Sequence, residues 1–158
     1  MKKISILLLT GCAFFMTGCG CNKKELKTVT CKLNQKYDDY NYEVQMIFEY
    51  DDKKIKNYER TENIVLIDKT KSSSYNDFLE YMERFDEEID NYDYNYEIGE
   101  EKIETELSVD FEKVDIEKIL GAPGLYKEFY DYDNKFFDID LALDALMNDD
   151  DYKGLKCE

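Results

Sequence analysis

The sequence predicts an α+β fold: a mostly antiparallel sheet with helices packed on one face, in the order βββαββααβ. Three observations predict it. Several segments alternate apolar and polar residues, which is typical of strands. Other segments follow a capping residue and repeat apolar side chains at helical spacing. The strands come in runs instead of alternating one by one with helices, and this favours α+β over a parallel α/β sheet.

The first half of the chain predicts three strands. Residues 26–33 place Val29, Cys31 and Leu33 on one face, and residues 42–50 alternate clearly. Residues 54–62 are polar on both faces, so we expect this third strand to be an edge strand or half exposed. The short apolar run that follows, 64–67, is of uncertain type.

The middle of the chain predicts a helix and two further strands. Ser74 and Asp77 resemble a capping box, and apolar residues then repeat at helical spacing through residue 90: Tyr75, Phe78, Leu79, Met82, Phe85 and Ile89. Residues 92–98 and 103–111 alternate as strands. Their outward face is acidic, which is typical of an antiparallel sheet with one solvated side: Asp93, Glu97, Glu104, Glu106 and Asp110.

The last quarter predicts two short helices and a terminal strand. Asp115 can cap a helix that ends at Leu120 before Gly121, and Asp138 can cap a second helix that ends near Asn148. Between them, residues 125–137 are irregular and rich in aromatic side chains. Residues 152–157 are a plausible last strand, so residues 27–158 form a single α+β domain.

The N-terminus resembles a bacterial lipoprotein signal. Lys2 and Lys3 precede an apolar run, and small residues stand directly before Cys19. We therefore expect a signal peptide over residues 1–18, followed by a lipidated Cys19 that carries palmitate and a short tether over 19–26. Cys12 and Cys21 are weaker alternatives, because the first leaves a short apolar core and the second has no apolar residue at the first lipobox position.

The competing interpretations of this segment are a transmembrane anchor and a plain secreted protein. The apolar run is shorter than the ~20 residues that a spanning helix needs, and a plain secreted protein does not explain the cysteine at the cleavage point. The expected location is the extracytoplasmic face of the cell membrane, with the membrane itself as the first partner, through the lipid.

The charge balance limits the other partners. The chain has 21 basic and 37 acidic residues, a net charge of −16. Nucleic-acid affinity comes from neutralising phosphates with basic side chains, so nucleic acid is excluded as a partner. Cations or basic peptides remain compatible with such a surface.

Three cysteines remain after Cys12 and Cys19 are assigned to the signal and the lipid. Cys31 lies in the first predicted strand and Cys157 near the C-terminus, so a disulfide between them would tie the two ends of the domain together. Closing so long a loop contributes at most ~4–5 kcal/mol. A zinc site is the alternative, but the chain has no CxxC motif and no histidine. We predict the Cys31–Cys157 disulfide and a free Cys21.

The aromatic segment 125–137 is the candidate ligand site. Tyrosines beside carboxylates suit sugars or basic peptides, and the candidate residues are Tyr126, Tyr130, Tyr132, Asp131 and Asp133. The alternative is that these rings seal the edge of the sheet.

Three other sites are weaker. The acidic strand face could bind cations, but a solvated face is favoured. Asp149, Asp150 and Asp151 resemble part of a calcium loop, but Lys153 occupies a ligand position, so an acidic turn is favoured and no metal is expected. Paired carboxylates could serve a glycosidase, yet the chain has no histidine and few serines. We therefore expect that the protein is not an enzyme and holds no cofactor.

The whole mature chain is similar to the YehR-like small bacterial lipoproteins, whose function is uncharacterised. The resemblance is carried by the lipobox, the order of elements over 27–158, and two segments, 110–115 and 152–157. It implies a compact α+β domain on a lipid anchor and transfers no catalytic residue.

These expectations lead to a membrane-anchored lipoprotein with a non-catalytic binding role, toward a cell-envelope ligand such as cell-wall glycan, a basic peptide or a partner protein. The alternative is a structural or accessory subunit that acts only through a partner protein.

Overall fold

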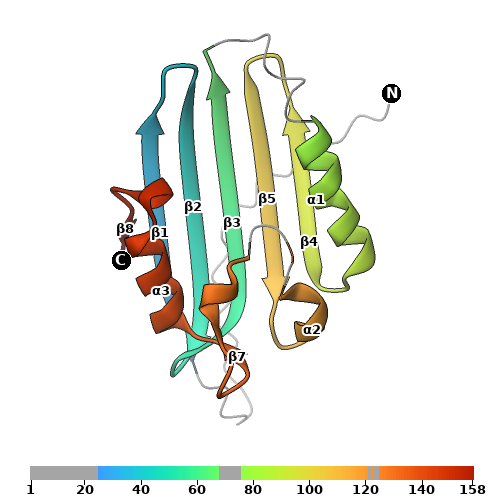
Figure 1. Cartoon of the computed structure of the whole chain (residues 1–158), viewed down its shortest axis with the longest axis vertical. Coiled ribbons are helices and arrows are strands. Elements are labelled where there is room, and N and C mark those ends of the chain that lie inside the picture. The colour runs from blue at the N-terminus through green and yellow to red at the C-terminus, as the bar shows by residue number, and fades with distance from the viewer. Residues whose placement is uncertain (1–24, 68–75, 121, 123–124) are drawn as a thin grey trace, which may run out of the picture.

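The computed structural model describes residues 25–67, 76–120, 122 and 125–158, and its centre is a six-stranded antiparallel sheet (Figure 1). The strand order is β4-β5-β3-β2-β1-β8. The strands are β1 (Lys27–Lys36), β2 (Tyr40–Asp51), β3 (Lys54–Leu66), β4 (Tyr92–Ile98), β5 (Lys102–Asp110) and β8 (Lys156–Cys157).

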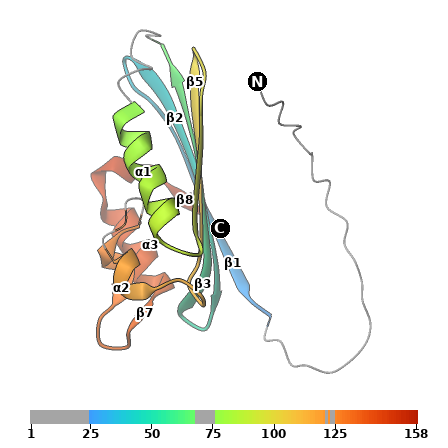
Figure 2. The ribbon, with the colours of Figure 1, turned by 90° about the vertical axis from the view of Figure 1, so that its right-hand side faces the viewer.

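The helices lie on one side of this sheet (Figure 2). They are α1 (Asn76–Glu88), α2 (Ile116–Ile119), α3 (Ile139–Asn148) and the 3₁₀ turns η2 (Lys127–Phe129) and η3 (Asp150–Tyr152). A small hairpin, β6 (Tyr130–Asp131) and β7 (Phe136–Phe137), lies between α2 and α3 in the chain. The predicted mostly antiparallel α+β class is confirmed, with α1 near the β4 edge and α3 near β1 (Figure 1).

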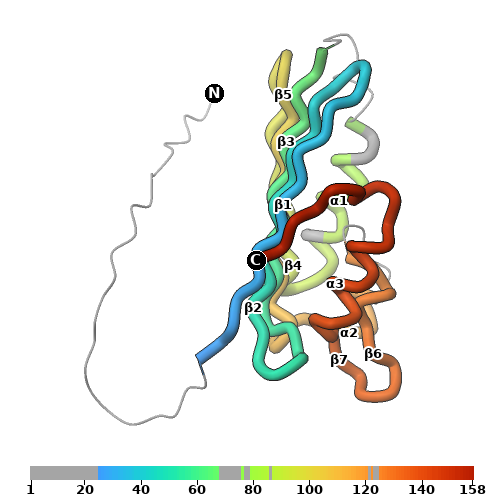
Figure 3. The backbone as a smooth tube through the Cα atoms, turned by 90° about the vertical axis from the view of Figure 1, so that its left-hand side faces the viewer, coloured from blue at the N-terminus to red at the C-terminus, as the bar shows by residue number. Residues whose placement is uncertain are grey.

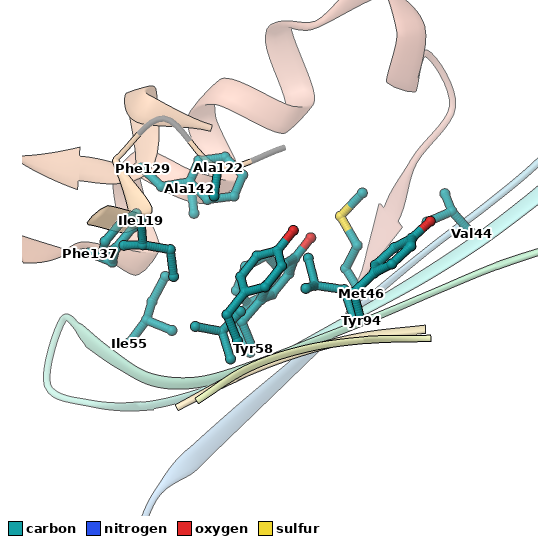
Figure 4. Close-up of a cluster of buried hydrophobic side chains, with 14 of the residues drawn as sticks. Val44, Met46, Ile55, Tyr58, Tyr94, Ile119, Ala122, Phe129, Phe137 and Ala142 are labelled. Carbon is teal, nitrogen blue, oxygen red and sulfur yellow. The ribbon is translucent and has the colours of Figure 1, made fainter. Parts of the chain in front are cut away.

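The core lies between the sheet and these helices. Inward residues of each strand alternate with outward polar residues, because side chains of a strand point to opposite faces in turn. Ile55 and Tyr58 rise from β3 toward Ile119, Phe129 and Phe137 in the helical layer (Figure 4). All five are buried, so the C-terminal third of the chain closes the core that the strands begin.

The two short C-terminal helices begin where the sequence predicts. The Asp115 carboxylate accepts a hydrogen bond from the Glu117 N–H at 3.1 Å. The Asp138 carboxylate accepts from Asp140 and Leu141, at 2.8 and 3.2 Å. Each cap satisfies backbone donors that the first helical turn leaves without a partner. Ser74, Tyr75 and Gly121, which figured in the predicted helix ends, lie outside the described residues.

Of the two alternatives for the third strand, the edge position is wrong, whereas the half-exposed strand agrees with its burial, since most of its residues are partly buried. β3 lies between β2 and β5 and continues through the apolar run to Leu66. Two features explain its polar residues. One face of the strand is solvated, and the other carries Arg60 and Glu62, which form an ion pair. Paired charges can occupy a covered face that unpaired charges could not.

The predicted order βββαββααβ omits the β6–β7 hairpin. Each of its strands is two residues long, too short for alternation to reveal. The turn is held by the Asp131 carboxylate, which accepts hydrogen bonds from the Asp133 and Asn134 N–H groups, both at 2.9 Å. The terminal strand is also shorter than predicted, because residues 150–152 form η3 and Gly154 turns the chain at φ +98°.

The two ends of the described domain meet at β1. Strand β8 pairs with β1 beside the C-terminus (Figure 3), and Cys157 lies directly opposite Cys31. The two sulfur atoms are 2.00 Å apart, so the cysteines predicted to pair lie at disulfide distance. Within the described ranges, none of the helices combines the length and the apolar character needed to cross a bilayer.

Candidate functional site

A half-buried ion pair on β3 forms the floor of the candidate site. Arg60 and Glu62 point to the helix-covered face, and their side chains are only 12% and 18% exposed. The Arg60 Nη2 atom lies 2.7 Å from Glu62 Oε1. A charged pair at this depth is expensive to desolvate unless further hydrogen bonds complete it.

Those hydrogen bonds come from three other strands and turns. Thr105, which is directly opposite Glu62 on β5, donates its hydroxyl to Glu62 Oε2 at 3.0 Å. The Tyr42 hydroxyl donates to Glu62 Oε1. Arg60 Nη2 in turn donates to the Tyr152 hydroxyl oxygen at 3.0 Å. Both carboxylate oxygens of Glu62 are therefore occupied by partners within the protein.

Tyr126 and Tyr152 extend the network into the helical layer. Their hydroxyls are hydrogen-bonded to each other, and their rings meet edge to face at 6.1 Å. Tyr152 ends η3, whose start is fixed by the Asp149 carboxylate accepting from the Asp151 N–H at 2.9 Å. The C-terminal turn thus delivers a hydroxyl to the ion pair on the sheet.

Two more tyrosines stand near the β1–β2 turn. The rings of Tyr37 and Tyr40 stack with their centroids 4.6 Å apart. Tyr37 is 40% exposed, and its hydroxyl donates to Gln35, whose amide donates to the Lys153 carbonyl at 2.7 Å. The stacked pair is thereby connected to the C-terminal turn that carries Tyr152.

These residues enclose a cleft of about 370 Å³, which we name the tyrosine cleft. The volume falls within the ~300–1,000 Å³ typical of small-ligand sites. Its lining residues are Tyr37, Tyr40, Tyr42, Arg60, Ile64, Tyr126, Asp151 and Tyr152.

Burial keeps two hydroxyls of the cleft, those of Tyr42 and Tyr152, protonated. Burial raises the pKa of Tyr42 and of Tyr152 well above the usual tyrosine value. Burial, the largest single influence, would lower the pKa of Arg60, but the Glu62 carboxylate and the neighbouring tyrosines together outweigh it, so that pKa lies above its ordinary value. The site therefore offers protonated hydroxyls and a charged guanidinium, which suit hydrogen bonding and ring stacking better than proton transfer at neutral pH.

The structure brings one of the five predicted ligand residues to this cleft. Tyr126 lines it, whereas Tyr130 is half-buried against Phe137, with ring centroids 5.2 Å apart. Tyr132 is 64% exposed and rests edge to face on Tyr130. Asp131 holds the hairpin turn through its hydrogen bonds, and these lower the pKa of its carboxyl group. Asp133 is exposed on the same turn. Tyr130 thus partly seals the core, as the alternative interpretation of these rings expects.

The sequence did not single out the other cleft residues as ligand residues, although Asp151 was considered as part of a calcium loop. Arg60 and Glu62 alternate in step with Tyr58 and Ile64 on β3, so all four point to the same face of the strand. This alternation was the sequence signal that a basic and an acidic residue occupy the inward face. Tyr37 and Tyr40 lie together at the β1–β2 turn, far in the chain from Tyr152, and no local pattern brings that pair and Tyr152 together.

The outward sheet face has a larger hollow of about 700 Å³ over β1, β2, β3 and β8. It is lined by amides, charged groups and apolar residues such as Leu33 and Val44 and has no aromatic ring, so we place the candidate site at the tyrosine cleft. The predicted acidic residues also point outward, where Asp110 pairs with Lys113 at 2.6 Å. Among the described residues, no three potential metal-ligating side chains gather at one place.

Two solved structures resemble this fold. The NMR structure of the E. coli YehR protein has a TM-score of 0.54, 13% sequence identity, and covers 84% of this chain and 91% of that chain. The NMR structure of a protein from Streptococcus pneumoniae TIGR4 has a TM-score of 0.45, 16% identity, and covers 77% and 79%. No family model and no curated protein sequence matches the chain. The similarity to YehR indicated by the sequence is confirmed at the level of the fold.

Proposed function

We propose that the protein is a lipid-anchored, extracytoplasmic binding protein that holds a cell-envelope ligand in the tyrosine cleft and catalyses no reaction. The observation that carries the proposal is the cleft itself: five tyrosines arranged around a half-buried ion pair. Concave sites with aromatic walls and a few polar groups that converge on them are typical of small-ligand binding.

The absence of catalysis is argued from the groups in the cleft. Glu62 already accepts hydrogen bonds from Arg60, Tyr42 and Thr105, so its oxygens have little capacity left for a substrate proton. Tyr42 and Tyr152 hold their protons because their pKa values are raised. A general base needs a pKa near the working pH, and the raised pKa values of Tyr42 and Tyr152 do not meet that requirement.

A lipid at Cys19 is supported by the N-terminal signal, which lies outside the described residues. We expect Cys19→Ala to abolish incorporation of labelled palmitate and to move the chain out of the membrane fraction. Cys21→Ala is the matched control and should leave both unchanged. Retained palmitate in Cys19→Ala would contradict the assignment of the lipid to this residue.

The binding role is tested on the mature chain, residues 19–158 with Cys19→Ser. Thermal unfolding is measured against cell-wall fragments, oligosaccharides and short cationic peptides. A ligand at 100 times its dissociation constant stabilises the folded state by about 2.7 kcal/mol. We expect one class to raise the melting temperature and Tyr37→Ala to weaken that effect. Tyr132→Ala, which removes a more exposed ring outside the cleft, should not.

If none of these ligands raises the melting temperature, the alternative is favoured: an accessory subunit that acts only through a partner protein. Crosslinking of the anchored protein at the membrane would then identify that partner. A ligand whose effect survives Tyr37→Ala but is lost in Tyr132→Ala would move the site to the β6–β7 hairpin.

A further inference from the structure

We infer that the tyrosine cleft recognises an uncharged sugar chain, in preference to a cationic or an anionic ligand. This inference rests on the proposed function and specifies its ligand. It depends on three features of the cleft: its charge balance, its hydrogen-bonding groups and the stacked rings near the β1–β2 turn.

The charge balance disfavours ions of either sign. The positive charge of Arg60 is compensated by Glu62, 2.7 Å away, and the chain as a whole has a net charge of −16. An anionic ligand would therefore meet long-range repulsion and no uncompensated cation among the lining residues. A cationic ligand would find the Glu62 oxygens occupied and only Asp151 as an additional lining carboxylate.

The hydrogen-bonding groups suit hydroxyls that both donate and accept. Arg60 Nε is buried and finds no hydrogen-bond partner among the described residues. A buried donor of this kind is normally satisfied by solvent or a ligand. In the Tyr126–Tyr152 pair either oxygen can be the donor, so the pair can adapt to an approaching hydroxyl. A sugar edge supplies hydroxyl groups of both characters.

The stacked rings suit the other surface of a sugar. Tyr37 and Tyr40 are 4.6 Å apart with an interplanar angle of 23°, and Tyr37 is 40% exposed. An aromatic face packs well against the C–H face of a pyranose ring, while the hydroxyl edge reaches polar groups beside it. A linear basic peptide has no such flat face to offer.

The test uses probes with the same sugar rings and different charge. They are the tetramer of N-acetylglucosamine, which is uncharged, and the tetramer of glucosamine, which is cationic. Maltotetraose adds a second uncharged sugar, and tetralysine adds a cationic peptide. Each is titrated into the mature chain calorimetrically at low and at high salt. We expect an uncharged tetramer to bind with an affinity that salt leaves unchanged, because no ion pair is made.

Variants locate the binding. Tyr37→Ala should weaken the uncharged tetramer about five- to tenfold through lost stacking. Tyr126→Phe, which keeps the ring and removes one hydroxyl, should also weaken it. Tyr132→Ala should leave the affinity unchanged. Circular dichroism of each variant establishes that it is folded.

The outcomes separate this inference from the proposed function. Salt-dependent binding of glucosamine tetramer or tetralysine, with no binding of either uncharged sugar, would overturn the assignment to an uncharged sugar. The binding role would remain if Tyr37→Ala weakens that salt-dependent binding. Uncharged sugar binding that is insensitive to Tyr37→Ala and Tyr126→Phe would overturn the location. Failure of all four probes would overturn the sugar assignment, and the wider ligand panel would then decide the binding role.

Discussion

Arg60 has an unusual position for an arginine: the middle of a central strand, facing the core. Its neighbours across the sheet are Met46 and Leu107, both buried and apolar. Such a charge is compatible with folding only because Glu62, Tyr42 and Tyr152 meet it with oxygen atoms. The residue therefore joins the stability of the sheet to the shape of the tyrosine cleft.

Removing one member of the ion pair should cost more than removing both. We expect Arg60→Met to lower the free energy of unfolding by about 3–5 kcal/mol, because Glu62 is left buried without its counter-ion. The double variant Arg60→Met/Glu62→Leu should recover more than half of that loss. Urea unfolding of the three proteins provides the measurement. Equal losses in the single and double variants would show that packing, not charge, dominates at this position.

Stability should fall at alkaline pH because of the buried tyrosines. Burial raises the pKa of Tyr94 to about 12 and raises those of Tyr42, Tyr58 and Tyr152 further. In the unfolded chain tyrosine ionises near pH ~10. A raised folded-state pKa means that the unfolded state loses protons first, so stability is fully present below pH ~10 and is lost as the pH rises toward the folded values.

The measurement is the urea midpoint between pH ~8 and ~11, followed together with tyrosinate absorbance. Tyr42→Phe should make the alkaline loss shallower, since one raised group is gone. Tyr132→Phe, which removes a hydroxyl from an exposed ring, should leave the profile unchanged. A profile that is level through pH ~10 and above would contradict the burial argument.

At the scale of elements, the short helices depend on their caps. Asp138 is buried and accepts from two N–H groups at the start of α3, a helix that covers the β1 side of the core. We expect Asp138→Ala to cost about 1 kcal/mol, within a range of ~0.5–2. Asp140→Ala removes only an exposed ion pair with Lys53, so its effect should be smaller. Thermal unfolding compares the two, and a larger loss in Asp140→Ala would be inconsistent with the cap.

The elements also show where sequence reasoning succeeds and fails. β2, β4 and β5 were predicted because each alternates buried and solvated residues over several positions. The central position of β3 was not predicted, because an inward Arg60 and Glu62 break that alternation and left an edge strand or a half-exposed strand as the alternatives. The β6–β7 hairpin was missed since two-residue strands are defined by their partner and their turn, not by any periodicity. Local patterns thus predict an element only when its burial repeats along the chain.

At the scale of the molecule, the cysteine pair links the first and last strands of the chain, β1 and β8, which lie side by side at one edge of the sheet. Cys31 is fully buried on β1, and Cys157 lies opposite it near the C-terminus. We expect Cys157→Ser to lower the free energy of unfolding by about 2–4 kcal/mol, because the link restricts the unfolded chain over a separation of 126 residues. Reductant added to the unchanged protein should lower its free energy of unfolding by a similar amount. The same reductant should leave the free energy of unfolding of Cys157→Ser unchanged.

Thiol alkylation tests the same pairing and the predicted free cysteine. The native mature chain with Cys19→Ser should take one label, at Cys21, and further labels only after reduction. Labelling of Cys31 and Cys157 in the native, unreduced protein would contradict the disulfide. Labels confined to the reduced protein would show that Cys21 is not free.

The sequence alone determined the class of fold, the caps of α2 and α3 and the two cysteines that lie at disulfide distance, because each depends on residue types that act over a few neighbours or, for the cysteines, on a very small set of choices. It also indicated one wall of the site, Tyr126. The tertiary structure alone decided that β3 is central, that Tyr130 packs against the core, and that tyrosines from β1, β2 and the last turn surround Arg60. Strand pairing and the covering layer bring together residues that no local periodicity connects, so the tyrosine cleft is a property of the packed molecule.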